Sequence, residues 1–373
     1  MKNSLFHFII IILLSLTLIN CNKENSVEST PDEEEPPNMT LFDRVLFYDG
    51  YAEKVTEKHQ SGIQRISNSR YVTKLTKSEL GAIGDTLEIE IIIEAACDNY
   101  DRIGNVFLSL TKKGHPFHND LLVKQIEIAR FITPFMNKNK LPNEVPYYFN
   151  ISNIAKFLKD PDISSKYDFW IEFSVFGVPY AAQNEVPGCA GRNDVFFGTV
   201  KFNTNGESTD KANQEILPFA TYASLNNTNN SDIPGQTVRS FTVDVSSALK
   251  NVKMYLITSN HGANAGGEEY NRRTHKIYFD ENLIDTYKPG GKSCEPYRQY
   301  NTQGNGIYGS GPRTESEWTS WNNWCPGDKI PIRIYDLGNI EEGNHKFKIE
   351  VPDAEFVNRE GNIPLSVYIQ GDL

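Results

Sequence analysis

Residues 86–102 read TLEIEIIIEAACDNYDR, a strand pattern that runs into a polar loop. Apolar and acidic residues alternate in residues 86–95, so every second side chain from Leu87 onward lies on one face of a β-strand. The loop that follows carries Asp98 and Asp101. Loops at strand ends commonly carry catalytic groups, although a single Asp there is more often a turn former that bonds its own backbone. The stretch predicts a β-strand and marks one candidate site.

Short segments with a strand pattern continue through the chain. Clusters of Pro, Gly, Asn and Lys separate them, which is the spacing of an antiparallel sandwich. Aromatic residues make up 12% of the sequence and no long segment repeats the 3.6-residue helical period, so composition also favours β structure. The 373 residues suffice for two domains, and the polar residues 203–212 (NTNGESTDKA) have the composition of a linker. We expect an N-terminal domain at residues 40–205 and a C-terminal domain at residues 213–373.

The first 39 residues have the composition of an export signal and a tether. Residues 1–20 place a lysine before a short apolar run, which is typical of a secretory signal peptide and too short for a membrane span. The closing letters LINC resemble the lipobox of bacterial lipoproteins. That resemblance implies lipidation of Cys21 and a location in the bacterial cell envelope, on the outer membrane, facing the periplasm or the surface. Residues 21–39 are acidic and lack aromatic side chains, so they cannot offset their ordering entropy by burial.

The charges and cysteines narrow the function classes. No cluster of Lys and Arg of the kind that binds nucleic-acid phosphates is present in the sequence. No CxxC pair or Cys/His cluster indicates zinc, and a proline interrupts the one HxxH motif, His115 and His118. We therefore expect no metal, no cofactor and no nucleic acid. If Cys21 is lipidated, four cysteines remain for disulfides in an exported chain, and three pairings are open. These are Cys97, Cys189, Cys294 and Cys325.

Two further segments carry acids whose role is open. In residues 167–177 (YDFWIEFSVFG) the alternation separates Trp170 and Glu172 from the core-facing side chains. The ordinary interpretation is an exposed sheet face with a salt-bridged acid. The alternative is a sugar platform, because an aromatic ring stacks on the C–H face of a pyranose while an acid bonds its hydroxyls. Glu268 and Glu269 in turn lie either in a solvated turn or in a set of catalytic carboxylates.

Five segments in order together resemble one family. They are CDNYDRIGNVFL, EIARFITPF, FWIEF, GGEEYNRRTHKIYFD and NWCPGDKIPIRI. They look like the signature blocks of the peptide-N-glycosidase F family, bacterial amidases that remove N-glycans from glycoproteins. The resemblance covers roughly residues 40–370. It implies two eight-stranded antiparallel jelly-roll domains packed side by side, with an active site in the cleft between them.

The resemblance also implies residue roles. Asp101 matches the family's principal catalytic aspartate, Glu269 the catalytic glutamate of the second domain, and Glu172 the third acid. Glu268 is then ordinary loop charge. Arg102 matches an arginine that contacts the sugar, and Trp324 a tryptophan at the site wall. Together with the sugar-platform interpretation of the strand, the expected substrate-binding residues are Arg102, Tyr100, Trp324, Phe135 and Trp170.

Carboxylates at one cleft suit this chemistry. Cleaving the bond between an asparagine side-chain amide and the first GlcNAc needs a base to activate water and an acid to help the glycosylamine leave. Neighbouring carboxylates in a partly dry cleft cannot all ionise cheaply, so their pKa values are pushed apart and divide these roles. We expect a monomeric, lipid-anchored amidase that acts on N-glycosylated proteins or glycopeptides.

The sequence departs from the family in its disulfide cysteines. The cysteine pairs that the family places beside the catalytic Asp and Glu are incomplete, with Gly267 and Asn271 at the second pair. The resemblance retains Cys294 with Cys325, and we expect Cys97 to pair with Cys189.

The site wall departs as well. Trp321 stands where the family has an arginine, for which Arg313 in the preceding loop is the candidate substitute. Phe135 replaces a tyrosine and Tyr100 a tryptophan. An inactive glycan- or glycopeptide-binding lipoprotein on the same fold is therefore the alternative function, ahead of a purely structural or adhesive role. Copper monooxygenases share the architecture but need histidine-rich sets, and the seven histidines here are scattered.

Overall fold

The computed structural model describes residues 38–205, 213–225, 237–263, 267–357 and 360–373. The expected signal peptide, the lipidation site Cys21, nearly all of the tether and most of the expected linker lie outside these residues. In the described part of the chain, no helix is both long and apolar enough to cross a membrane.

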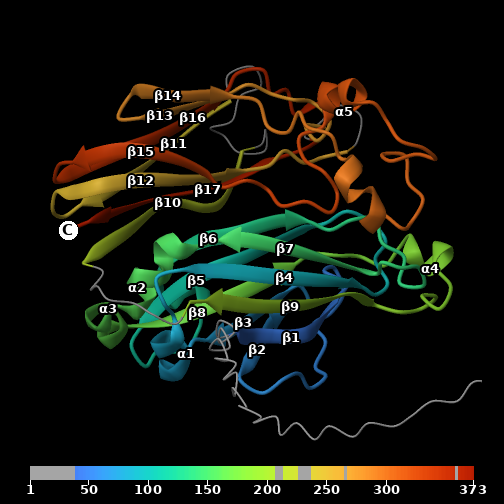
Figure 1. Ribbon diagram of the computed structural model, residues 1–373, viewed down its shortest axis with the longest axis horizontal. Helices are drawn as coiled ribbons and strands as arrows, with labels where there is room; N and C mark the ends of the chain where they lie inside the picture. Colours follow the sequence, from blue (N-terminus) through green and yellow to red (C-terminus); the bar gives the residue numbers. More distant parts are fainter. Residues whose placement is uncertain (1–37, 206–212, 226–236, 264–266, 358–359) are drawn as a thin grey trace, which may run out of the picture. The chain divides into compact units, whose positions relative to one another are not determined.

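The N-terminal half forms two antiparallel sheets, with strand orders β1-β9-β4-β7 and β2-β3-β8-β5-β6 (Figure 1). The strands are β1 (Asn38–Tyr48), β2 (Ile63–Ser67), β3 (Arg70–Lys74), β4 (Leu87–Ala95), β5 (Ile103–Lys112), β6 (Leu122–Ile132), β7 (Glu144–Asn150), β8 (Tyr167–Val175) and β9 (Asp194–Thr204). The alternation that predicted β4 is confirmed, because its apolar face, from Leu87 to Ile93, is buried in the core between the two sheets. The core-facing side of β8, from Phe169 to Val175, packs in the same core.

The C-terminal half repeats the arrangement with strand orders β10-β17-β12-β15 and β11-β16-β13-β14. The strands are β10 (Gln214–Leu225), β11 (Thr237–Val245), β12 (Leu249–Thr258), β13 (His275–Phe279), β14 (Asn282–Tyr287), β15 (Arg333–Ile340), β16 (Gly343–Val351) and β17 (Ile363–Asp372). A separate apolar core fills this second sandwich. The expected all-β fold with two sandwich domains is confirmed. The described residues hold eight strands in the second half and nine in the first, where β2 adds an edge strand to β3.

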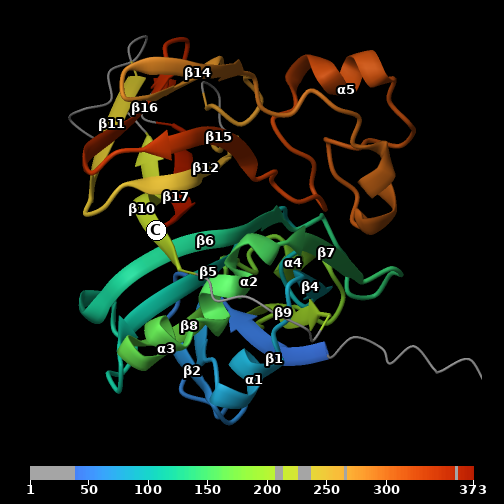
Figure 2. The same ribbon diagram turned by 60° about the vertical axis from the view of Figure 1, so that its left-hand side comes forward.

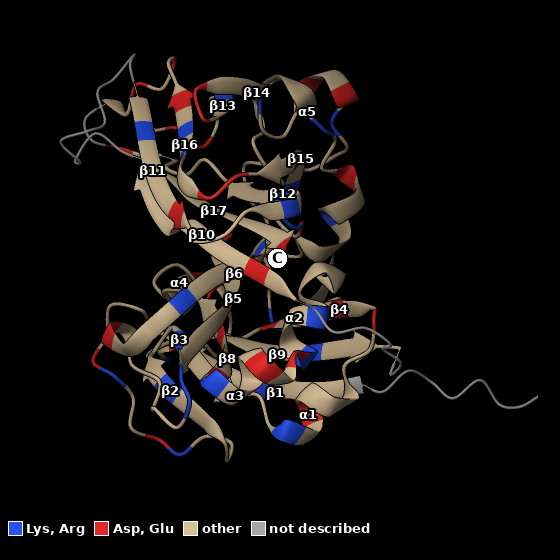
Figure 3. Cartoon of the chain, turned by 90° about the vertical axis from the view of Figure 1, so that its left-hand side faces the viewer, with Lys and Arg blue, Asp and Glu red and all other residues tan. Residues whose placement is uncertain are grey.

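Helices are short and lie at the ends of the sandwiches. They are α1 (Lys77–Ala82), α2 (Ala155–Lys159), α3 (Pro161–Lys166), α4 (Ala182–Glu185) and α5 (Glu315–Trp321), with 3-10 turns η1 (Asn119–Leu121), η2 (Ser152–Ile154) and η3 (Glu295–Tyr300). Both expected disulfides are confirmed: Cys97 pairs with Cys189, and Cys294 pairs with Cys325. Acidic and basic segments are interspersed over both halves (Figure 3).

Strand β6 of the first sandwich runs beside β10 and β17 of the second (Figure 2). At this junction Glu127 and Arg130 form an ion pair whose side chains are both fully buried, with 2.7 Å between Arg130 Nη2 and Glu127 Oε2. Arg130 Nη1 also donates across the junction to Ser259 Oγ at 2.9 Å and to the carbonyl oxygen of Pro364 at 2.8 Å. Ser366 in β17 donates in the other direction, to Glu127. A buried, hydrogen-bonded charge pair therefore joins the two halves.

Removing one member of this pair should lower the free energy of unfolding. Replacing Arg130 by Met leaves Glu127 buried without its cation, so we expect the free energy of unfolding to fall by about 3–5 kcal/mol. The double variant Glu127→Gln/Arg130→Met removes both buried charges and should recover part of that loss. Arg44→Met is the matched control, because the Arg44 side chain is 56% exposed in its pair with Glu94 and should contribute at most about 1 kcal/mol. Denaturant unfolding of the three variants measures the differences, and equal losses for Arg130→Met and Arg44→Met would contradict the assignment.

Candidate active site

Two adjoining cavities open where the sandwiches meet, and Asp101 and Arg102 line both of them. Cavity 1 has a volume of about 620 Å³ and cavity 2 of about 730 Å³. The walls of cavity 1 include Arg70, Asn105, Gln125, Glu172, Tyr222 and His261. The walls of cavity 2 include Tyr100, Phe135, Glu269, Tyr270, Arg313 and Trp321. Asp101 therefore lies at the junction of two spaces, each large enough for part of a substrate.

The loop that carries Asp101 is fixed by its own polar groups. Asp98 is almost fully buried and accepts hydrogen bonds from Arg102 Nε at 2.7 Å and from the backbone N–H groups of Val178 and Tyr100 at 2.7 and 3.0 Å. The disulfide at Cys97 closes the other end of the loop. Asp98 is thus the turn former that the sequence left open, and it leaves Asp101 to face the cavities.

The Asp101 carboxyl group leaves one of its two oxygens unpaired inside the protein. Its Oδ2 atom is buried and has no hydrogen-bond partner among the described residues. Burial, and then the nearby charge of Glu269, raise the pKa of Asp101 to about 8. Such a group carries its proton at neutral pH and can give it to a substrate atom.

Glu269 reaches the site from the other sandwich. Its Oε2 accepts a hydrogen bond from the backbone N–H of Gly262 at 3.1 Å, and its carboxylate also accepts one from Tyr270. Burial raises the pKa of Glu269, and these two hydrogen bonds partly offset the rise. Asn323 Nδ2 holds the loop backbone through the carbonyl oxygen of Glu269 at 2.5 Å. Asp101 and Glu269 thus share cavity 2, and their charges interact across the domain junction.

The third expected acid has a different environment. Glu172 on β8 lines cavity 1 but not cavity 2. Arg70 donates to both of its oxygens, at 2.7 and 3.0 Å, and Gln125 Nε2 lies 3.3 Å away. The structure brings Asp101 together with Glu269 in one cavity and with Glu172 in the other. A carboxylate held by a bidentate arginine suits substrate binding better than proton transfer.

The expectation that Glu268 is ordinary loop charge is wrong. Its side chain is fully buried and accepts hydrogen bonds from Arg273 Nε at 2.6 Å and Nη2 at 3.3 Å. The backbone N–H groups of Glu355 and Phe356 also donate to it, at 2.9 and 3.0 Å. These partners satisfy a buried charge and anchor the loop from which Glu269 projects.

Three of the expected substrate-binding residues lie at cavity 2. The rings of Tyr100 and Phe135 are tilted against each other with centroids 5.6 Å apart. Arg102 places its guanidinium carbon 5.4 Å from the centre of the Tyr100 ring while it remains paired with Asp98. Tyr100 is 43% exposed, so its ring is accessible from the cavity.

The other two expected substrate-binding residues do not line either cavity, which corrects the sequence-based assignment. Trp324 is buried in an apolar cluster and donates from Nε1 to the carbonyl oxygen of Asn260 at 2.8 Å. Trp170 is buried beside Phe117 and donates to Thr111 Oγ1 at 3.0 Å. Each ring finds a hydrogen-bond partner inside the fold, as buried tryptophans usually do.

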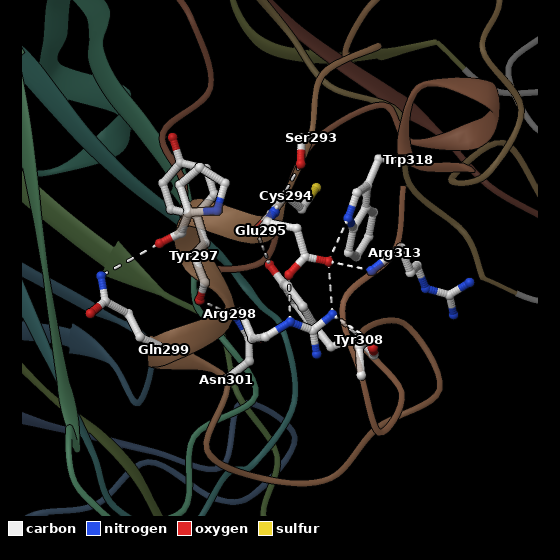
Figure 4. Close-up of polar contacts among 12 residues, drawn as sticks. Ser293, Cys294, Glu295, Tyr297, Arg298, Gln299, Asn301, Tyr308, Arg313 and Trp318 are labelled. Carbon is white, nitrogen blue, oxygen red and sulfur yellow. Dashed lines mark hydrogen bonds and ion pairs between the residues drawn. The ribbon is translucent and has the colours of Figure 1, made fainter. Parts of the chain in front are cut away.

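The loop before α5 supplies part of the lining of cavity 2, and polar contacts beside this loop centre on Glu295 (Figure 4). The Glu295 carboxylate accepts hydrogen bonds from Trp318 Nε1 at 2.8 Å, from the Arg313 backbone N–H at 2.7 Å and from Arg298. The Arg313 guanidinium points away from that carboxylate and donates to the carbonyl oxygen of Ile307 at 2.7 Å. Arg313 and Trp321 both line cavity 2, so the candidate substitute for the missing arginine does reach the same space.

Sequence reasoning missed several cavity residues. Tyr270 follows Glu269 directly, and its ring lies 5.4 Å from that of Trp321, centroid to centroid. Its place beside a candidate acid was a usable signal. Arg70 and His261 had none, since each reaches cavity 1 only through tertiary packing. No group of three His, Cys, Asp or Glu side chains in the described ranges could hold a metal ion, and both His115 and His118 are exposed.

Several solved structures share this fold. PNGF-II is 19% identical with a TM-score of 0.65, and the match covers 91% of this chain and 66% of PNGF-II. PNGase F, described as a glycosylasparaginase from Flavobacterium meningosepticum, is 15% identical with a TM-score of 0.58, and the match covers 91% and 96% of the two chains. A peptide-N(4)-(N-acetyl-beta-D-glucosaminyl) asparagine amidase is 18% identical with a TM-score of 0.56, at 90% and 95% coverage. At these identities the likeness establishes the jelly-roll fold of both domains.

Sequence comparison with family models adds the assignment. No curated protein matches the chain. Residues 38–190 match the family model of Peptide-N-glycosidase F, N terminal, and residues 229–370 match that of Peptide-N-glycosidase F, C terminal. Since the two models match most of the chain in their proper order, the chain belongs to the peptide-N-glycosidase F family.

Proposed function

We propose that the protein is an amidase that hydrolyses the bond between asparagine and the first GlcNAc of N-linked glycans. The glycan is released and aspartate remains in the glycoprotein or glycopeptide. The observation that carries the proposal is the pair formed by Asp101 and Glu269, a buried and a partly buried carboxyl group from different domains at the junction of two cavities. Family membership supports the substrate class.

The pair can divide acid and base work. Glu269, stabilised as a carboxylate by the Gly262 N–H and by Tyr270, takes a proton from water as the water oxygen attacks the amide carbonyl carbon. Asp101 gives its proton to the amide nitrogen as the carbon–nitrogen bond breaks, so a neutral glycosylamine leaves. Positioned proton transfers of this kind are worth about 10²- to 10⁴-fold in rate. The cavities on either side of Asp101 give separate room to the glycan and the peptide.

One observation favours the alternative, an inactive protein that binds glycans or glycopeptides. Trp321 occupies the wall of cavity 2 against Tyr270, where the family resemblance implies an arginine. Arg313 lines the same cavity and supplies a cation there, which is why we place the amidase first. We also propose that the protein acts as a monomer on the bacterial outer membrane, held by a lipid on Cys21.

The direct test uses the protein with a denatured N-glycoprotein. Mass spectrometry should detect free glycan together with conversion of the glycosylated asparagine to aspartate. No conversion, under conditions in which an established amidase of this family is active, would refute the amidase. Binding of the glycopeptide without conversion would then establish the alternative.

Asp101→Asn should slow turnover strongly and stabilise the fold. Loss of the proton donor should lower kcat by about 10²- to 10⁴-fold. The raised pKa of Asp101 means that its charged form is disfavoured in the folded protein, a penalty that develops as pH rises from about 4 to about 8. Asn carries no charge, so the melting temperature of the variant should exceed that of the wild type increasingly over that range. Asp120→Asn, at an exposed site, is the control and should change neither quantity.

The pH dependence of kcat/KM should follow the ionisation of Asp101 and Glu269. We expect kcat/KM to fall as pH rises through about 8, because Asp101 then loses the proton that it must donate. At low pH the rate should fall as Glu269 takes up a proton. Tyr270→Phe removes a hydrogen bond that lowers the pKa of Glu269, so the acid limb should move to higher pH. A profile that stays flat between pH 7 and 10 would rule out the assigned roles.

A further inference from the structure

His261 is a buried histidine at cavity 1 that the proposed reaction does not use. It follows β12 and lines the same cavity as Asp101. Its backbone N–H donates to the carbonyl oxygen of Asn362 at 2.9 Å, and the reverse bond has the same length, so the residue has a fixed position. Its ring lies 5.6 Å from that of Trp324, centroid to centroid.

A chain of hydrogen bonds determines which ring nitrogen carries the hydrogen. Arg130 Nη1 can only donate, so Ser259 Oγ accepts its bond at 2.9 Å. Ser259 Oγ lies 2.7 Å from His261 Nε2. The hydroxyl has one hydrogen, and its remaining partner in the described chain is Nε2. If Nε2 donated instead, the Ser259 hydrogen would be buried without an acceptor among those residues. Ser259 therefore donates and Nε2 accepts.

The ring is neutral under ordinary conditions. Burial, and then the charge of Arg130, lower the pKa of His261 to about 3. A neutral imidazole whose Nε2 accepts must carry its hydrogen on Nδ1. Nδ1 has no hydrogen-bond partner in the described residues, and it is not among the atoms that are both buried and unpartnered. It is therefore an accessible donor on a residue that lines cavity 1.

We propose that His261 is a substrate-binding residue whose Nδ1–H donates a hydrogen bond to a carbonyl or hydroxyl oxygen of the substrate in cavity 1. Ser259 and Arg130 are positioning residues, which fix the tautomer and the ring orientation. The inference rests on the proposed function, because the substrate is the N-glycosylated peptide. Arg130 belongs to one domain and His261 to the other, so domain docking itself sets the donor in place.

Nuclear magnetic resonance tests the tautomer independently of activity. In the full protein labelled with ¹⁵N-histidine, the His261 ring should give the signals of a neutral imidazole protonated on Nδ1 from pH 5 to 8, assigned by their loss in His261→Gln. Ser259→Ala should shift the Nε2 signal or mix the tautomers, which a role in packing alone would not do. A hydrogen on Nε2 in the wild type, or an imidazolium ring, would overturn the proposal.

Two matched variants test the donor. The amide nitrogen of Asn can replace Nδ1, while the amide of Gln can replace Nε2 and keep the contact with Ser259. We expect His261→Gln to weaken glycopeptide binding about tenfold, the worth of one hydrogen bond, and His261→Asn to weaken it less. The reverse order would assign His261 to structure alone. His118→Gln, at an exposed histidine, should bind as the wild type does.

The binding measurements use calorimetry in the Asp101→Asn background, where turnover does not interfere. A glycopeptide, free chitobiose and the unglycosylated peptide are compared. If His261→Gln weakens the binding of chitobiose, the acceptor oxygen belongs to the glycan. If it weakens the binding of the unglycosylated peptide, the acceptor oxygen belongs to the peptide. Suppose that His261→Gln binds the glycopeptide as tightly as the protein that keeps His261, and that the wild type converts asparagine to aspartate. This result would overturn the inference and leave the amidase proposal intact. Failure to bind any ligand or to convert the substrate would instead refute the proposed function.

Discussion

The buried ion pair of Glu127 and Arg130 is the contact on which the site depends. Asp101 and Glu269 come from different sandwiches, so they can meet only if the domains dock in one orientation. Two partly polar surfaces could slide against each other, but a buried arginine must find its acceptors at defined positions. Arg130 finds them in Glu127, Ser259 and Pro364. The pair thus specifies a register between domains, a role for which buried charges are well suited.

The two loops that carry the acids are held by different means. A disulfide and the buried Asp98 fix the first loop, whereas polar groups alone fix the second. The ion pair of Glu268 and Arg273 anchors this loop. Asn323 Nδ2 lies within hydrogen-bond distance of three of its carbonyl oxygens, those of Glu268, Glu269 and Asn271. Glu269 is therefore held in place although the family's cysteine pair beside it is missing. Several hydrogen bonds at fixed geometry restrict the loop as a covalent link would.

The sequence predicted those features of the structure that depend on a few neighbouring residues. Alternation found β4 and β8 because a strand's period is a property of a few residues. The family resemblance supplied the pair Cys294–Cys325, which left Cys97 to pair with Cys189. Sequence reasoning failed for Glu268, whose burial depends on Arg273 and on backbone groups far along the chain. Trp170 and Trp324 failed for the same reason, since their hydrogen-bond partners lie in other strands and loops. Whether a polar or aromatic side chain faces a cavity is decided by tertiary packing, which the sequence pattern does not contain.

The balance of charge around the cavities bears on the substrate. Arg102 is paired with Asp98 and Arg70 with Glu172, so both cations are neutralised by the fold. Neither Asp101 nor Glu269 forms an ion pair with a cation of the described residues, and burial favours one shared proton over two charges. A substrate that brought its own anion to this junction would meet an ionised Glu269, while the Arg313 guanidinium of cavity 2 donates to the carbonyl oxygens of Ile307 and Gly306. A neutral amide between an asparagine and a GlcNAc meets a proton donor on one side and an acceptor on the other. The electrostatics of the junction, apart from any resemblance, therefore favour an uncharged linkage.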